Sequence, residues 1–284
     1  MIFACLAVVI STAASLAVQS TGTAPGFVFD IIGDRTGSAV AGVYEEVWRE
    51  VDADHPEFVL TVGDTIEGGN DENAEKEWQK VMQILAPYRH YQIFFTPGNH
   101  DVWSLSSAIT YKKYSERPLH YSFDFKQGHF TVLDNSRSDM LSAPQYAFLQ
   151  KDLEEHATQP VKFIISHRPF WIYYVALGNP NFGLHQLAKK YGVKYVIAGH
   201  IHEMLHYELD GITYISEGSS GGHLRLDKAY EKGWFFQHTR VRVDQDRATF
   251  TIKEVAPPFG QSRVTRLDDW GPTGLAPNAD PETR

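Results

Sequence analysis

Short apolar runs rich in Val, Ile and Phe alternate along the chain with longer amphipathic stretches. Such alternation is typical of a layered α/β domain, in which helices cover buried strands. We therefore expect an α/β fold with strands at 27–32, 58–62, 93–96, 121–125, 130–133, 161–165, 195–198 and 212–215. A later pair of apolar runs, 235–243 and 248–255, predicts two more strands joined around residues 244–246.

Other stretches show helical spacing or predict a turn. Residues 78–85 carry Trp, Val, Met and Leu at positions i, i+3, i+4 and i+7, as on one face of a helix. Ser142 followed by Gln145 gives the pattern of a capping box at the start of another helix. The stretch 121–133 reads as a hairpin that turns at Gln127-Gly128. Because a hairpin brings an antiparallel pair into the sheet, we expect a mixed sheet.

Side chains that can bind a metal ion follow almost every predicted strand. They are Asp34 in GDRTG, Asp64 in VGDTIEGG, Asn99, His100 and Asp101 in TPGNHD, His167 in ISHRP, and His200 and His202 in AGHIH. Because the carboxyl ends of strands in an open α/β sheet converge on one crevice, we expect a single pocket. Oxygen and imidazole donors without sulfur suit Mn, Fe or Zn at a catalytic site. Two metals about 3.5–4 Å apart would give His200 and His202 separate partners.

The composition narrows the class of protein. With 284 residues, of which 43% are hydrophobic and 21% charged, the chain can form one large domain with a full core. A formal net charge of -9 argues against binding to a nucleic-acid polymer, so an anionic substrate would need a local positive centre. Cys5 is the only cysteine. Without it the chain has no thiol for a disulfide, a nucleophile or a metal site.

The two ends of the chain differ from its middle. Residues 1–20 are apolar and small, and Ser15-Leu16-Ala17 forms a small-x-small site, so the segment resembles a secretory signal peptide. No Lys or Arg precedes the apolar run, which leaves an uncleaved anchor or a misassigned start as alternatives. We expect an exported protein, periplasmic or extracellular, with no stable membrane span after cleavage. The main domain is expected at 26–256, followed at 257–284 by a loosely attached tail of polar, Pro and Gly residues.

The ordered set GD, GD, GNHD, H and GHxH resembles the calcineurin-like metallophosphoesterase superfamily over residues 30 to about 217. The resemblance implies two mixed β-sheets packed as a sandwich and flanked by helices, the four-layer αββα arrangement, around a dinuclear metal centre. It also implies hydrolysis of small phosphomonoesters or phosphodiesters, in which a hydroxide between the two metals attacks phosphorus in line.

The matching motif positions also imply a role for each candidate residue. His100, backed by Asp101, would stabilise the transition state or protonate the leaving oxygen. Two divalent ions would give an acidic chain the positive centre that a phosphate needs. The implied metal ligands are Asp34 and His202 for the first ion, Asn99, His167 and His200 for the second, and Asp64 as the bridge.

The first motif departs from the pattern of most superfamily members, which is Asp-x-His with the histidine on the first metal. Thr36 takes that position here, and a short hydroxyl is a weaker donor than imidazole. We therefore expect an oxygen-rich first site that prefers Mn, with Mg, Fe or Zn as alternatives. Arg35 has only donors, so it either clamps phosphate or pairs with a carboxylate such as Asp30 or Glu67. The alternative function is a non-catalytic binding protein that has lost the first metal, and the retained His100 favours an enzyme.

Overall fold

The computed structural model describes residues 25–224, 230–255, 263–277 and 282–283. The signal peptide predicted for residues 1–20 lies outside this part of the chain. Among the helices that the described residues form, none has the length and apolar character needed to span a bilayer.

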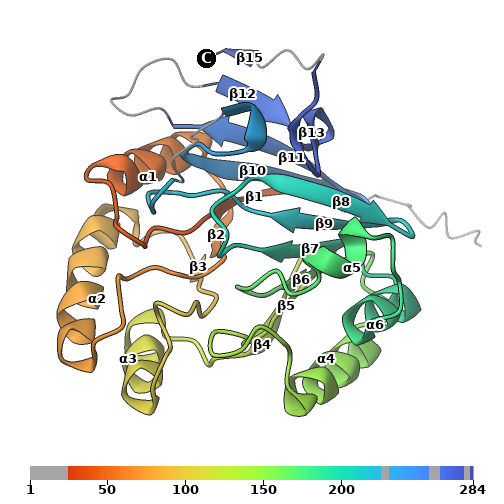
Figure 1. Ribbon diagram of the computed structural model, residues 1–284, viewed down its shortest axis with the longest axis horizontal. Helices are drawn as coiled ribbons and strands as arrows, with labels where there is room; N and C mark the ends of the chain where they lie inside the picture. The colour runs from red at the N-terminus through yellow and green to blue at the C-terminus, as the bar shows by residue number, and fades with distance from the viewer. Residues whose placement is uncertain (1–24, 225–229, 256–262, 278–281, 284) are drawn as a thin grey trace, which may run out of the picture.

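One β-sheet has seven strands within the described residues, and in Figure 1 it runs from β15 at the top to β3 at the left. They are, in spatial order, β15 (Glu282–Thr283), β12 (Arg263–Arg266), β11 (Arg247–Glu254), β10 (Gln237–Asp244), β1 (Phe27–Ile32), β2 (Phe58–Thr61) and β3 (Ile93–Phe94). β1 pairs in parallel with β2 and antiparallel with β10. The sheet is therefore mixed, as expected.

The second sheet has six strands within the described residues. They are, in spatial order, β4 (Tyr121–Phe125), β5 (Gly128–Val132), β6 (Val161–Ile165), β7 (Tyr195–Ala198), β9 (Ile212–Ser216) and β8 (Leu205–Leu209). β5, β6, β7 and β9 run in parallel, whereas the edge strands β4 and β8 are antiparallel to their neighbours. β4 and β5 form the predicted hairpin, which turns through Lys126 and Gln127.

Helices cover the outer face of each sheet, which gives four layers (Figure 1). On the first sheet lie α1 (Val43–Asp54), α2 (Asp71–Leu85) and α3 (Leu105–Ser115), and on the second α4 (Ala143–Glu155), α5 (Ile172–Ala176) and α6 (Gly183–Tyr191). Three 3-10 helices are η1 (Ala86–Tyr88), η2 (Tyr230–Lys232) and η3 (Leu267–Asp269). The predicted fold class, two mixed sheets flanked by helices, is confirmed.

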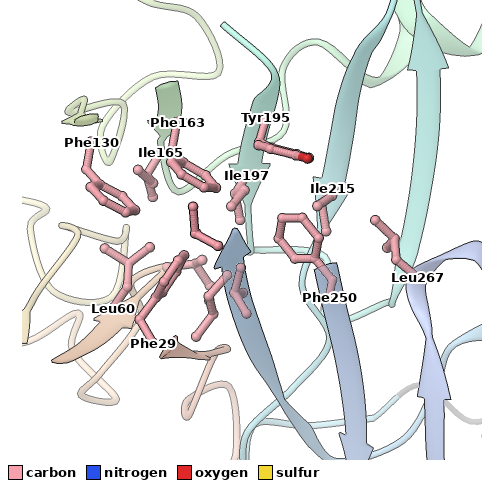
Figure 2. Close-up of a cluster of buried hydrophobic side chains, with 14 of the residues drawn as sticks. Phe29, Leu60, Phe130, Phe163, Ile165, Tyr195, Ile197, Ile215, Phe250 and Leu267 are labelled. Atoms are coloured by element: carbon pink, nitrogen blue, oxygen red, sulfur yellow. The ribbon is translucent and has the colours of Figure 1, made fainter. Parts of the chain in front are cut away.

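Aromatic side chains fill the space between the two sheets. Figure 2 shows Phe29 and Leu60 of the first sheet facing Phe130 and Phe163 of the second. The rings of Phe29 and Phe163 meet edge to face with centroids 5.7 Å apart. Because side chains alternate along a strand, Phe27, Phe29 and Ile31 of β1 point into this core, while Ile32 packs in the cluster that contains the buried residues of α1. The apolar contact between the sheets fixes the ends of β1, β2, β6 and β7 relative to one another.

Parts of the fold differ from the sequence-based expectations. Strand β8, which follows the AGHIH motif, was not among the predicted strands. Ser142 is the N-cap of α4, but its side chain makes no capping hydrogen bond. The Gln145 side chain does not complete a capping box, because its Oε1 accepts a hydrogen bond from the Asp134 backbone N–H at 3.0 Å.

The expectation for the C-terminal tail also needs correction. Residues 263–266 form β12, which pairs with β11, and the short ribbon of β13 (Trp270–Gly271) and β14 (Gly274–Leu275) follows. Trp270 is buried in the core between the sheets, with its ring centroid 5.1 Å from that of Phe235. The prediction of a loosely attached tail is therefore wrong for residues 263–275, because the buried side chain of Trp270 anchors them to the core. The domain boundary at residue 256 remains a prediction.

Candidate metal centre

The predicted metal-binding residues come together at the ends of five strands. Asp34, Asp64 and Asn99 follow β1, β2 and β3, whereas the histidines follow β6 and β7. Within each of two groups, donor atoms lie within 4.8 Å of one another: Asp34, Asp64 and His202, and Asp64, His167 and His200. Asp64 belongs to both groups. The Asn99 Oδ1 lies 3.0 Å from the His167 Nε2, next to the second group.

The backbone turns sharply at three of these residues. Asp64, His200 and His202 have φ angles of 56°, 74° and 60°, in the left-handed region that non-glycine residues rarely adopt. Hydrogen bonds hold the turns in place: the Asp34 carboxylate accepts the His200 N–H at 2.9 Å and the Asp64 Oδ1 accepts the His100 N–H at 2.8 Å. Gly98 is required beside them, since a Cβ there would lie 2.2 Å from the Asp64 Oδ1. Backbone strain of this kind is typical of functional sites.

In the second group several hydrogen-bond acceptors face one another, with too few N–H or O–H hydrogens to join them. The His167 Nδ1–H donates to the Val62 carbonyl at 2.8 Å, which leaves a lone pair on Nε2 of the neutral ring. That Nε2 faces Asn99 Oδ1 at 3.0 Å, Asp64 Oδ1 at 3.2 Å and His200 Nδ1 at 3.2 Å. Acceptors that face one another need a cation between them, so the donor set fits a metal ion.

The protonation of the metal-free cluster leads to the same conclusion. Burial favours the neutral form of His167, but the charges of Asp64 and Asp34, together with hydrogen bonding to Asp64 and the Val62 carbonyl, outweigh burial and raise the pKa of His167 to about 9. Burial likewise opposes the charge of Asp64, but His167 and His100 together outweigh burial and lower the pKa of Asp64 to about 2. Burial lowers the pKa of His200 to about 4, with a further contribution from charged His167. The cluster thus holds one proton where positive charge is needed.

His202 completes the first group, and Thr36 stands two residues after its member Asp34. The His202 Nδ1–H donates to the His223 carbonyl at 2.7 Å, and its Nε2 lies 3.8 Å from the Asp34 Oδ1. Asp34 is fully buried, and burial raises its pKa to about 6. Thr36 is also fully buried, and its Oγ1 has no hydrogen-bond partner among the described residues.

His100 lies at the rim of the cluster, and Asp101 does not support it as expected. The His100 Nδ1 bonds to the Glu67 carbonyl, and its Nε2, on a side chain 34% exposed, lies 4.0 Å from the Asp64 Oδ2. The buried Asp101 carboxylate accepts the backbone N–H groups of Thr65 at 2.8 Å and Gly98 at 2.9 Å. Asp101 therefore ties together the loops that carry Asp64 and Asn99. Burial and the nearby Asp64 raise the pKa of Asp101 to about 7.

Arg35 forms neither of the ion pairs suggested by the sequence. Its Nη1 donates to the Thr65 carbonyl at 3.2 Å, and its guanidinium lies over the Tyr44 ring at 5.5 Å. Asp30 instead bonds to a buried histidine of β10, and Glu67 accepts backbone N–H groups of the loop after β1. Contact between Arg35 and a phosphate remains a prediction.

Asn135 is a structural contributor that the sequence analysis missed. It is 2% exposed and follows β5, and its Oδ1 accepts the backbone N–H groups of His167 and Arg168, both at 3.0 Å. Its Nδ2 donates to the Arg168 carbonyl at 2.8 Å. These bonds fix the loop that presents His167. The available signal was its place directly after the predicted strand 130–133.

Comparisons with known proteins bear on this site. The calcineurin-like phosphoesterase family model matches residues 31–204. Purple acid phosphatase 23 of Arabidopsis thaliana is 30% identical over 176 residues, which cover 53% of this chain and 38% of that protein.

Solved structures share the fold at lower identity. Purple acid phosphatase PPD1 from yellow lupin (Lupinus luteus) seeds has a TM-score of 0.63 and 15% identity, covering 92% of this chain and 54% of that one. A dimetal phosphatase from Danio rerio has a TM-score of 0.58 and 13% identity, covering 85% of this chain and 99% of that one. The chain thus spans 38% of the length of the Arabidopsis relative and about half of the lupin protein.

Proposed function

The chain belongs to the calcineurin-like phosphoesterase family, and on this basis we propose that it hydrolyses small phosphoric esters with two divalent metal ions. The main support is the convergence of acceptor atoms around Asp64, which is shared by both groups of candidate ligands. In this proposal Asp64 bridges the ions, Asp34 and His202 hold the first, and Asn99, His167 and His200 hold the second. Ions bound there would act as Lewis acids and lower the pKa of bound water toward about 7.

The identity of the ions follows from the donors of the first group. Two carboxylates and one imidazole form an oxygen-rich set, and Thr36 adds a hydroxyl in place of a second imidazole. Oxygen donors favour Mn or Mg over Zn and Fe, so Mn is the proposed ion. The leader pattern of residues 1–20 supports the further proposal that the protein is exported.

His100 is proposed to act on the leaving oxygen. Its Nδ1 is held by the Glu67 carbonyl, which directs Nε2 toward solvent beside Asp64. A protonated Nε2 can donate to the oxygen that leaves phosphorus. The acidic composition argues against a nucleic-acid polymer as substrate, and the exposed edge of His100 is accessible to small esters.

The proposed activity is tested by loading the purified chain with Mn and counting the bound ions. Hydrolysis of p-nitrophenyl phosphate and of bis(p-nitrophenyl) phosphate is then followed, and the ratio of the two rates separates monoesterase from diesterase activity. We expect two ions per chain, turnover of at least one ester, and loss of both properties after chelation. A single bound ion with no turnover of either ester would instead favour the non-catalytic binding protein.

Replacing His100 with glutamine should lower kcat by about 100-fold or more for an alkyl ester such as glycerol 2-phosphate. The loss should be smaller for p-nitrophenyl phosphate, because nitrophenolate leaves without a proton. Metal content should not change, since His100 belongs to neither group of ligands. His90→Gln is the matched control, because His90 is an exposed histidine that lies near Asp52 and belongs to neither group of ligands. Equal losses for both esters would contradict a role in leaving-group protonation.

Replacing Thr36 with histidine should tighten the more weakly bound ion by about tenfold, since it restores an imidazole donor. Thr36→Val has nearly the same volume but lacks the hydroxyl, and it should weaken that ion. Thr96→Val is the control, because Thr96 is likewise buried with an unpartnered Oγ1 but belongs to neither group. The measurement is a calorimetric titration with Mn. Unchanged affinity in both Thr36 variants would refute this account of the first site.

A further inference from the structure

A cavity of about 430 Å³ lies beside the proposed metal centre. It is bounded by α3, by the segment before β4 and by the loop after β5, and none of the candidate metal ligands lines it. Asn135 belongs both to its lining and to the hydrogen bonds that hold His167. The cavity and the metal centre are therefore built on a common loop, and its volume is in the range of small-molecule sites, about 300–1,000 Å³.

Two cations on the cavity lining have no partner. The side chains of Lys112 and Arg137 form no hydrogen bond or ion pair with any described residue. Nearby cations are engaged, as Lys113 pairs with Glu75 and the Arg168 guanidinium pairs with Asp139 at 2.6 Å. Both of these unpaired side chains line the same cavity, in a chain whose net charge is -9. They make the cavity a candidate site for an anion.

A chain of hydrogen bonds adds a third donor. The Asp134 backbone N–H donates to Gln145 Oε1 at 3.0 Å, which orients the amide so that its Nε2–H donates to His120 Nδ1, also at 3.0 Å. A ring that accepts at Nδ1 carries its proton on Nε2. The His120 Nε2–H has no acceptor among the described residues and is free to donate to a ligand.

The acidic side chain on the lining, Asp134, bonds to its own loop through one oxygen. The Asp134 Oδ1 accepts the backbone N–H of Ser136 at 3.1 Å and its hydroxyl at 2.6 Å. Lys112, Arg137 and His120 thus offer three donor groups to the cavity, and Asp134 is the one carboxylate on its lining. Groups with only donors to offer bind phosphate or carboxylate oxygens.

We propose that this cavity binds a second anionic group of the phosphoester substrate, so that the preferred substrates are small phosphoesters carrying a further phosphate or carboxylate. This rests on the proposed hydrolysis at the adjacent metal centre. One anionic group would be held by Lys112, Arg137 and His120 while the other lies at the metal ions. The cavity then selects substrates by their second charge and contributes nothing to the chemical step.

The test compares fructose 1,6-bisphosphate with fructose 6-phosphate on the Mn-loaded chain. Lys112→Ala and Arg137→Ala should each raise KM for the bisphosphate roughly tenfold while KM for the monophosphate changes less than about twofold. Lys113→Ala is the matched control, because the neighbouring lysine of the same helix pairs with Glu75 outside the cavity. It should leave both KM values unchanged.

Equal changes for both sugar phosphates, or the same effect from Lys113→Ala, would overturn the proposal, because either result reflects general charge. Should the loaded protein turn over neither sugar phosphate nor p-nitrophenyl phosphate, the proposed hydrolysis fails separately. Calorimetric titration of that protein with fructose 1,6-bisphosphate then still decides the question, with Kd in place of KM. Tenfold weaker binding in Lys112→Ala supports the cavity site, and equal binding refutes it.

Discussion

Replacing Asp64 with asparagine is expected to lower kcat/KM by about three orders of magnitude or more, because metal ions supply several kcal/mol of transition-state stabilisation. Asparagine keeps the shape of the side chain but removes the charge shared by both groups of ligands. It also removes the charge that raises the pKa of His167 to about 9, so the metal-free cluster loses its internal ion pair. We therefore expect the number of bound Mn ions to fall together with the rate.

Metal content by elemental analysis and steady-state hydrolysis of p-nitrophenyl phosphate are the measurements for Asp64→Asn. Asp244→Asn is the matched control, because Asp244 is an exposed carboxylate that pairs with Arg242 at 2.7 Å. The control should retain both ions and the full rate. An Asp64→Asn protein that keeps two ions and normal turnover would disprove the bridging role.

Replacing Trp270 with alanine should lower the free energy of unfolding by about 3–5 kcal/mol, the usual cost of removing a large buried aromatic side chain. Trp270 is 1% exposed, packs against Phe235 and Tyr230, and donates its Nε1–H to Thr265 at 2.6 Å. The loss combines the cavity with the broken hydrogen bond. The result measures how firmly residues 263–275 belong to the domain.

Urea-induced unfolding of the metal-free chain is the measurement for Trp270→Ala, since bound metal would add its own stabilisation. Tyr173→Ala is the control, because Tyr173 is an aromatic residue 80% exposed on α5. Its removal should change stability by less than about 0.5 kcal/mol. A similarly small effect for Trp270→Ala would show that the C-terminal segment is loosely attached after all.

The strands could be predicted because burial leaves a regular trace in the sequence. In β1, Phe27, Phe29 and Ile31 alternate toward the core between the sheets, and that pattern is visible without coordinates. The positions of Asp34 and Asp64 followed from the ends of such strands. That these side chains converge is a property of the layered fold, and the structure confirms the convergence.

Features that depend on single contacts across the fold could not be predicted. Gln145 fits a capping box in sequence, but its side-chain oxygen instead accepts a hydrogen bond from the backbone N–H of Asp134, eleven residues away. Asp101 stands next to His100, yet its carboxylate serves backbone groups of two loops. In the sequence Trp270 stands among Pro, Gly and charged residues, which give no indication that its side chain is buried. Local pattern gives no information on partners that only the tertiary fold brings near.

The candidate ligands come from both sheets of the sandwich, with Asp34, Asp64 and Asn99 on one and the three histidines on the other. A pair of ions held between them would link the two sheets directly. Sliding of one sheet over the other by a few ångströms would separate the two sets of ligands, so metal occupancy would depend on the alignment of the sheets. By the same linkage, a higher metal concentration around the protein would hold its two halves together more strongly.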